Sequence, residues 1–82
     1  MKENTSDLMH KHTLERIDNN KVSTQEWRAL RERHTRERLA GFADWERQRA
    51  DIEALSKFQK IRFDRLLNRQ QTEIRNLYGP PK

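Results

Sequence analysis

The segment "RERLAGFADWER", residues 36–47, decides how this chain folds, because it holds the one position at which a long helical pattern can turn. The glycines are Gly41 and Gly79, and no glycine or proline interrupts residues 42–78. Gly41 suits the left-handed conformation that ends many helices, and Asp44 suits the cap of a helix that follows. A bend over residues 40–44 would fold the chain into a hairpin of two helices.

The same segment also permits one continuous helix. A Schellman ending at Gly41 would bring Phe42 against Glu37, so the apolar contact that usually accompanies this ending is missing. A helix through residues 24–78 would be about 80 Å long and would need a partner helix along most of that length. The shortness of the chain favours the hairpin, but the sequence leaves both arrangements open.

The motif "VSTQEW", residues 22–27, predicts the start of the main helix. Ser23 and Glu26 have the spacing of a capping box, and Val22 and Trp27 have that of a hydrophobic staple. At the far end Gly79 suits the residue after the helix, and two prolines follow it. We therefore expect a main helix or hairpin over about residues 24–78 and a tail over residues 79–82.

Upstream, residues 6–20 predict a separate short helix. Ser6 can cap it, and the Asn-rich segment after Ile17 favours a turn, so its expected range is about 6–18. Residues 1–5 are expected to be disordered. The predicted fold is thus all-α and coiled-coil-like, with a single helical domain over residues 6–78 and no strand.

Apolar residues recur with a helical period along residues 27–77. With 32% hydrophobic and 38% charged residues in 82, the chain has little material for a monomeric core. We expect this apolar stripe to contact a second copy or a larger protein. Its predicted members are Trp27, Leu30, Phe42, Trp45, Ile52, Leu55, Phe63, Leu66, Ile74 and Leu77.

His34 and Gln70 fall on the same stripe and are expected to set its register, as buried polar residues do in coiled coils. A shift of 36 residues superposes Trp27 on Phe63 and His34 on Gln70. This match indicates either a duplication or the self-similarity of any helix with so biased a composition.

The net charge of +5 favours polyanions or acidic protein surfaces as partners. A predicted polyanion contact combines Lys57 and Lys60 with the row Arg62, Arg65 and Arg69. The alternative is a solvated helix flank whose long side chains cover the edge of the stripe. Acidic residues among these cations favour the alternative.

The segments "WRALRERHTRERLAGF" and "FDRLLNRQQTEIRNLY" share the unit Leu-x-x-Arg-(His/Gln)-x-x-Glu. They resemble the Arg/Glu-rich helical tails that follow the nuclease domain in plasmid mobilisation relaxases. The resemblance covers residues 27–78, and the catalytic tyrosine and histidine motifs of a relaxase are absent, so no functional residue can be assigned from it. It implies an origin on a plasmid, phage or other mobile element.

No Ser-His-Asp constellation, Gly-rich phosphate loop or carboxylate pair suggests catalysis, so we expect no enzyme and no small-molecule substrate. Cysteine is absent and His10 and His12 are poorly spaced for ligation, so no metal or cofactor is expected. The short apolar runs predict a cytoplasmic protein without a membrane segment. The leading hypothesis is a helical interaction protein, which self-associates or docks on a larger protein. The alternatives are a nucleic-acid-binding adaptor and a small inhibitor of a nucleic-acid-handling enzyme.

Overall fold

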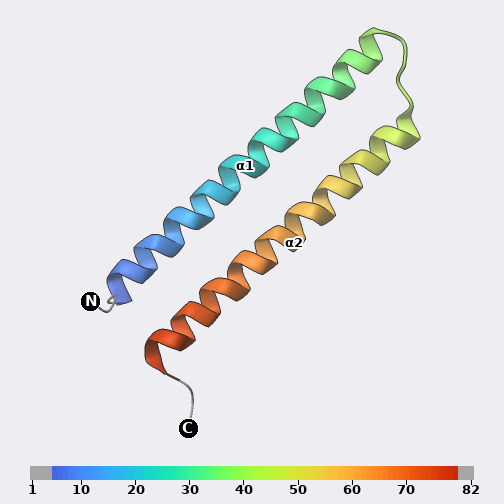
Figure 1. Ribbon diagram of the computed structural model, residues 1–82. Coiled ribbons are helices and arrows are strands. Elements are labelled where there is room, and N and C mark those ends of the chain that lie inside the picture. The colour runs from blue at the N-terminus through green and yellow to red at the C-terminus, as the bar shows by residue number, and fades with distance from the viewer. Residues whose placement is uncertain (1–4, 80–82) are drawn as a thin grey trace.

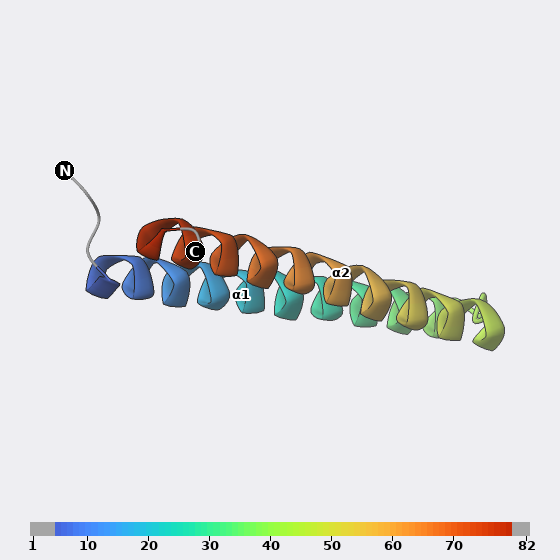
Figure 2. The same ribbon diagram turned by 90° about the horizontal axis from the view of Figure 1, so that it is seen from below.

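The computed structural model describes residues 5–79 and is a helical hairpin. Helix α1 (Thr5–Leu39) and helix α2 (Trp45–Tyr78) run antiparallel and lie side by side along their length (Figures 1 and 2). The molecule measures 61 × 23 × 12 Å. The structure therefore confirms the all-α hairpin and excludes the single continuous helix. It holds no strand within residues 5–79.

The turn is built as residues 36–47 predict. Gly41 has a φ of +77°, its N–H donates to the Arg38 carbonyl, and the Phe42 N–H donates to the Glu37 carbonyl at 2.8 Å. These two bonds form a Schellman motif, which here needs no apolar contact, since the Phe42 side chain is 78% exposed. The Asp44 carboxylate then accepts from the N–H groups of the second and third residues after it, which caps α2.

The predicted short helix over residues 6–18 and the new helix start at Ser23 are wrong, because α1 is continuous from Thr5 to Leu39. The capping-box residues have a different use. Ser23 Oγ and the Glu26 carboxylate both accept hydrogen bonds from Arg62 of α2. The side chain of Asn19, a residue of the predicted turn, also accepts a hydrogen bond from Arg62. Contacts with a distant part of the chain thus override a local capping signal.

The two ends of the hairpin close differently from the turn. Thr5 belongs to the segment predicted to be disordered, but it is the first residue of α1. Its hydroxyl lies 3.3 Å from the Tyr78 hydroxyl. Gly79 follows α2 with a φ of +81° and a ψ of 165°, so it has the predicted sign of φ but not the left-handed helical conformation. Residues 1–4 and 80–82 of the predicted terminal segments lie outside the described residues.

The residues that face each other between α1 and α2 repeat every 11 residues on both helices, and we call them the seam. All of them are buried or half-buried. An 11-residue repeat corresponds to about 3.67 residues per turn, so each repeat returns to the same side of the helix after three turns. The seam of α1 is Leu8, His12, Glu15, Asn19, Ser23, Glu26, Leu30, His34 and Glu37. The seam of α2 is Gln48, Asp51, Leu55, Gln59, Arg62, Leu66, Gln70, Glu73 and Leu77.

This 11-residue period is distinct from the 36-residue shift found in the sequence. That shift relates Trp27 on α1 to Phe63 on α2, and these helices run in opposite directions. The repeated contacts instead follow the 11-residue spacing within each helix.

The interior of the hairpin is mainly polar. Four polar side chains are buried, namely those of His12, His34, Gln48 and Gln70, whereas Leu8 is the one buried apolar side chain among residues 5–79. Burial of His34 and Gln70 in the interhelical contact agrees with the prediction. A seam of this kind specifies how the two helices align more than it supplies apolar stabilisation.

Candidate functional site

Three glutamines of α2 tie the two backbones together at 11-residue steps. The side-chain amides of Gln48, Gln59 and Gln70 donate to the carbonyl oxygens of His34, Ser23 and His12, at 3.3, 3.1 and 2.9 Å. A carbonyl oxygen has two lone pairs, so each can accept this bond besides the one within its own helix. The glutamines therefore hold α2 against α1 at regular steps along the hairpin.

A histidine and a carboxylate pair in each of the two outer repeats. His12 Nε2 lies 2.8 Å from Glu73 Oε2, and His34 Nε2 lies 3.1 Å from Asp51 Oδ2. Hydrogen bonds from these histidines are the main reason that the pKa values of Glu73 and Asp51 lie below their usual range. Burial opposes this effect in part, because it disfavours the charged carboxylate.

The central repeat reverses the charge of α2, with Arg62 in place of a carboxylate. Its guanidinium donates to Asn19 at 3.2 Å, to Ser23 Oγ at 2.9 Å and to both oxygens of Glu26, the shorter bond being 2.6 Å. This contact lowers the pKa of Glu26, chiefly through the hydrogen bond from Arg62, and raises the pKa of Arg62. Four hydrogen bonds thus hold the Arg62 guanidinium against α1.

Further ion pairs lie along one side of the seam, which we call the ionic face. They join Lys11 and Arg69 to Glu73, Arg69 to Glu15, and Arg33 to Asp51 and Glu37. Most of these side chains are partly exposed, so each pair adds little free energy by itself. The carboxylates of the seam are nevertheless neutralised on this face by neighbouring cations.

One cluster on this face has the composition of a cation site. Ligand atoms of His12, Glu15 and Glu73 all lie within 4.8 Å of one another. His12 Nδ1 and Glu15 Oε1 are buried and have no hydrogen-bond partner among residues 5–79. Lys11 and Arg69 already bring positive charge to the two carboxylates, so we treat the cluster as part of the ion-paired seam.

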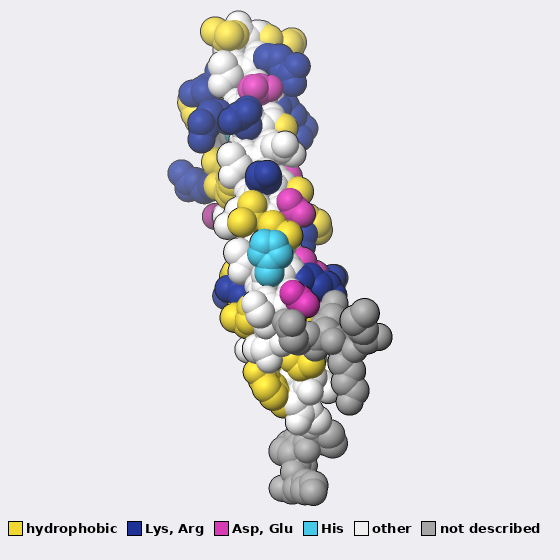
Figure 3. Space-filling model, turned by 90° about the vertical axis from the view of Figure 1, so that its left-hand side faces the viewer, with side chains coloured by type: hydrophobic (Ala, Val, Ile, Leu, Met, Phe, Trp, Pro, Cys, Tyr) yellow, Lys and Arg dark blue, Asp and Glu magenta, His cyan; other side chains and the backbone are white. Residues whose placement is uncertain are grey.

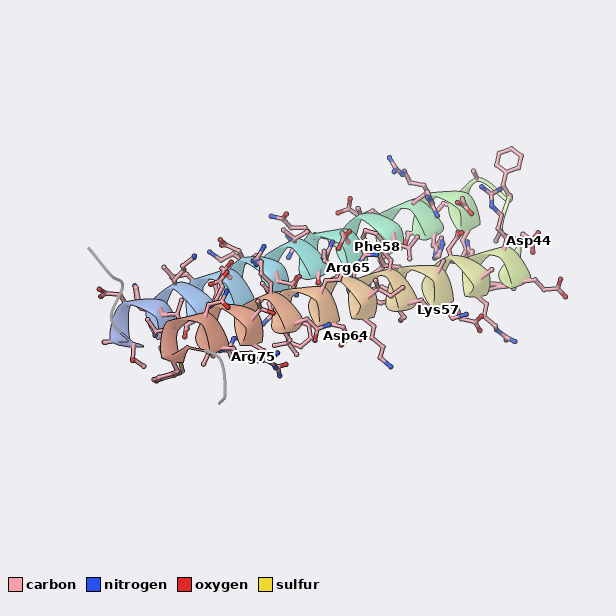
Figure 4. The ribbon with its side chains drawn as sticks, turned by 60° about the horizontal axis from the view of Figure 1, so that its bottom comes forward. Asp44, Lys57, Phe58, Asp64, Arg65 and Arg75 are labelled. Atoms are coloured by element: carbon pink, nitrogen blue, oxygen red, sulfur yellow. The ribbon has the colours of Figure 1, made fainter. Side chains whose placement is uncertain are left out.

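The predicted polyanion row is not one surface in the structure. Arg62 and Arg69 are bound to Glu26 and Glu15 of α1. Figure 4 shows Arg65 on the side of α2 nearer α1 and Lys57 on the side away from it. Lys60 is 11 residues from Arg49 and therefore lies on the same side of α2 as Arg49, which differs from the sides of both Arg65 and Lys57. The structure does not bring the five cations together.

The opposite side of the hairpin from the ionic face is hydrophobic, and we call it the apolar face. Ile52, Phe63 and Ile74 are spaced by 11 residues and share one side of α2, and Leu67 and Tyr78 share the next position with Trp45. Trp27 extends the face onto α1, and so does Met9, which is exposed and lies two 11-residue repeats before the groove residue Arg31. Met9, Leu67 and Tyr78 were not among the predicted interface residues, although the 11-residue spacing identifies the last two.

The predicted interface residues divide into three groups. Five of them lie on the apolar face, namely Trp27, Trp45, Ile52, Phe63 and Ile74. Four are the leucines at the centre of the seam, namely Leu30, Leu55, Leu66 and Leu77. Phe42 lies in the turn and is exposed. The predicted stripe thus combines the interior of the hairpin with one of its outer faces.

A groove of 480 Å³ opens on the apolar face next to the turn. Its apolar lining comes from Trp27, Leu30, Trp45 and Ile52. The charged residues that line it are Arg31, Arg38 and Arg49, and none of its lining residues is acidic. The Arg38 guanidinium lies 6.0 Å from the centre of the Trp45 ring and so joins the two helices at this end. The groove is therefore apolar at its base and positively charged along its rim.

Arginines are abundant near the turn beyond the groove as well. Figure 3, which looks onto the side of the hairpin where α1 lies, shows Lys and Arg side chains gathered towards the turn, with apolar patches among them. Residues 28–38 hold five arginines there, of which Arg33 is ion-paired with Asp51 and Glu37. Arg28, Arg31 and Arg36 form no ion pair with the described residues.

No protein-family model, curated protein or solved structure matches this chain. Within residues 5–79, neither helix contains a stretch long and apolar enough to cross a membrane.

Proposed function

We propose that this chain is a non-enzymatic helical interaction module that binds another protein through its apolar face. The observation that carries the proposal is that α2 has its paired polar side chains in the seam and large apolar side chains on the apolar face. Polar side chains are paired inside the seam, whereas large apolar side chains lie outside it, with Trp45 66% exposed. A continuous apolar patch on a solvent-exposed protein surface is typical of a binding site.

The apolar face has the residue types expected of an interface. It carries two tryptophans, a phenylalanine and a tyrosine, and aromatic residues are enriched at the centres of protein interfaces. Arginine, which is enriched there too, lines the groove on both helices. A partner that covers this face would bury apolar surface that the hairpin alone leaves in water.

In-cell photo-crosslinking tests the proposal. A photo-reactive phenylalanine analogue at Trp45 or Ile52 should crosslink to one discrete polypeptide in the native cells. Phe58 is the matched control position, because it is an apolar residue of α2 that is 55% exposed on the side of the ionic face. Equal crosslinking from both faces, or none from the apolar face, would contradict the proposal.

The hypothesis of a nucleic-acid-binding adaptor has less support from the geometry. Arg62 and Arg69 are engaged by carboxylates, and phosphate would have to compete with these contacts. A mobility-shift assay over a salt series should show no binding at physiological salt. The inhibitor hypothesis is a special case of the interaction module, in which the crosslinked protein would be an enzyme that handles nucleic acid.

A further inference from the structure

The charged residues of the apolar face are all of one sign. Arg31, Arg38 and Arg49 line the groove. Arg16 is 11 and 22 residues before Trp27 and Arg38, and Lys60 is 11 residues after Arg49, so both share these sides of their helices. Five cations therefore border the apolar face along its length.

No carboxylate of the described helices lines the groove. Glu32 lines a separate hollow, which it shares with Arg31. Glu15, Glu26, Glu37, Asp51 and Glu73 lie in the seam and are bound there by cations or by hydrogen bonds. Asp64 lies on the side of α2 away from α1 (Figure 4), and Glu53 shares its position 11 residues earlier. Asp7 and Asp18 share the position of Ala29, which lines a hollow on the ionic face together with Arg33 and Asp51.

This distribution of charge favours an acidic partner over a second copy of the hairpin on the apolar face. Two copies of the hairpin packed face to face would bring their arginine rows together, without a carboxylate on either face to separate them. Like charges at a desolvating interface are unfavourable. A partner with acidic flanks would instead pair with the same arginines at the rim.

The shape of the face indicates one helix. A valley between two parallel or antiparallel helices accepts a third helix at the ordinary interhelical distance of about 8–10 Å. The groove beside the turn is lined from both helices, and the apolar positions continue from it along α2 to Phe63, Ile74 and Tyr78. A ligand that uses the whole face is therefore long and apolar on one side.

We propose that the apolar face binds an acidic amphipathic helix of a partner protein, which completes a three-helix bundle. The apolar stripe of that helix packs on Trp27, Trp45 and Ile52, and its glutamates or aspartates pair with Arg31, Arg38 and Arg49. This inference rests on the proposed function, since it names the partner chemistry of the same face.

Two designed peptides test the inference on the full chain. Both carry the same leucine stripe over six helical turns, and the residues that flank the stripe are glutamates in one peptide and lysines in the other. Binding is followed by the fluorescence of Trp27 and Trp45 and by titration calorimetry. The glutamate peptide should bind at least ten times more tightly than the lysine peptide, and more weakly as salt is added.

A charge-reversed variant makes the test specific to this face. In the triple variant Arg31→Glu, Arg38→Glu, Arg49→Glu the lysine peptide should become the tighter binder. The control variant Arg28→Glu, Arg36→Glu, Arg65→Glu has the same net charge but changes residues outside the groove lining, so it should keep the original preference. Circular dichroism shows whether each variant retains its helices.

Each other outcome overturns the inference in a distinct way. Equal binding of both peptides removes the role of the arginines. No peptide binding together with a dimer in light scattering, in which the tryptophans are shielded, assigns the face to a second copy. Binding to anionic phosphatidylserine vesicles with no peptide binding assigns it to a lipid surface. If Trp45 crosslinks to a protein in cells but the glutamate peptide does not bind, the proposed function stands and the acidic partner is wrong.

Discussion

Gln70 and His12 are 58 positions apart in the chain, yet the side-chain amide of Gln70 donates to the His12 carbonyl at 2.9 Å in the interior of the hairpin. Both residues are buried, and the same contact recurs between Gln59 and Ser23 and between Gln48 and His34. Side chain to backbone bonds of this kind do not depend on the identity of the accepting residue. These bonds therefore depend on the spacing of the two backbones and not on the side chain of the accepting residue.

Replacement of Gln70 by alanine should lower the free energy of unfolding by about 1–2 kcal/mol, because it removes a buried hydrogen bond and leaves a small cavity. Urea denaturation followed by circular dichroism measures this loss. Gln71→Ala is the matched control, since Gln71 is exposed and its side chain forms no hydrogen bond with the described residues, and its effect should stay within about 0.5 kcal/mol. Equal effects of the two substitutions would show that the glutamine layer does not stabilise the hairpin.

Replacement of Arg62 by alanine should be more damaging, by about 2–3 kcal/mol, because it leaves the part-buried Glu26 carboxylate without its cation. The loss should shrink when Glu26 is replaced by glutamine in the same chain, and a double-mutant cycle measures this coupling. Arg65→Ala serves as the control, because Arg65 is exposed and forms no ion pair with the described residues. Additive effects of the Arg62 and Glu26 changes would contradict the pairing.

The hairpin should lose stability in acid. Folding lowers the pKa values of Glu26, Asp51 and Glu73, so their contribution is complete above the pKa values of the unfolded chain, near 4, and is lost as the pH falls through the lower folded values. The urea midpoint should therefore fall between about pH 5 and pH 2.

The origin of this acid response can be assigned by substitution. The variant Asp51→Asn, Glu73→Gln removes two of the three titrating groups, so its urea midpoint should change less over the same pH range. Asp64→Asn removes a carboxylate on the outer side of α2 and should leave the pH dependence unchanged. A response that disappears in Asp64→Asn instead would refute the assignment.

Gly41 and Asp44 should each contribute about 1 kcal/mol to the turn. Gly41→Ala places a side chain at a φ of +77°, where the cost is conformational, because nothing lies within 4 Å of an added Cβ. Gly41→Asn should cost less, since asparagine tolerates this conformation better. Asp44→Ala removes the cap of α2. Thermal unfolding ranks these variants, and equal losses for alanine and asparagine at Gly41 would argue against strain as the cause.

Local signals were sufficient to predict the turn and the helical class. Gly41 and Asp44 act on backbone groups a few residues away, so their roles can be derived from sequence alone. The signal at Ser23 failed for the opposite reason. Its hydroxyl and the Glu26 carboxylate have a partner 36–39 residues away, and no local rule includes Arg62.

The division of the apolar stripe between the seam and the apolar face was not predicted either. A period of 3.6 residues assigned seam leucines and face aromatics to one stripe, because the angle between Leu55 and Ile52 on a helix is small. The 11-residue period separates them, and it is visible in the chain as "HTLERI" at residues 12–17 and "HTRERL" at residues 34–39. The regular spacing of Gln48, Gln59 and Gln70 would have identified the buried glutamines in the same way.

The central repeat has a consequence for how this hairpin avoids misalignment. If α2 slid along α1 by one 11-residue unit, the glutamines that remain opposite α1 would again meet carbonyl oxygens, so they accept several alignments equally. Arg62 would then meet Glu15 or Glu37 in place of Glu26, whereas Glu26 would face Asp51 or Glu73 with Ser23, and no histidine, beside it. The middle layer, which has Arg62 on α2 and Ser23 in the position of the histidines on α1, therefore favours one alignment of two otherwise periodic helices.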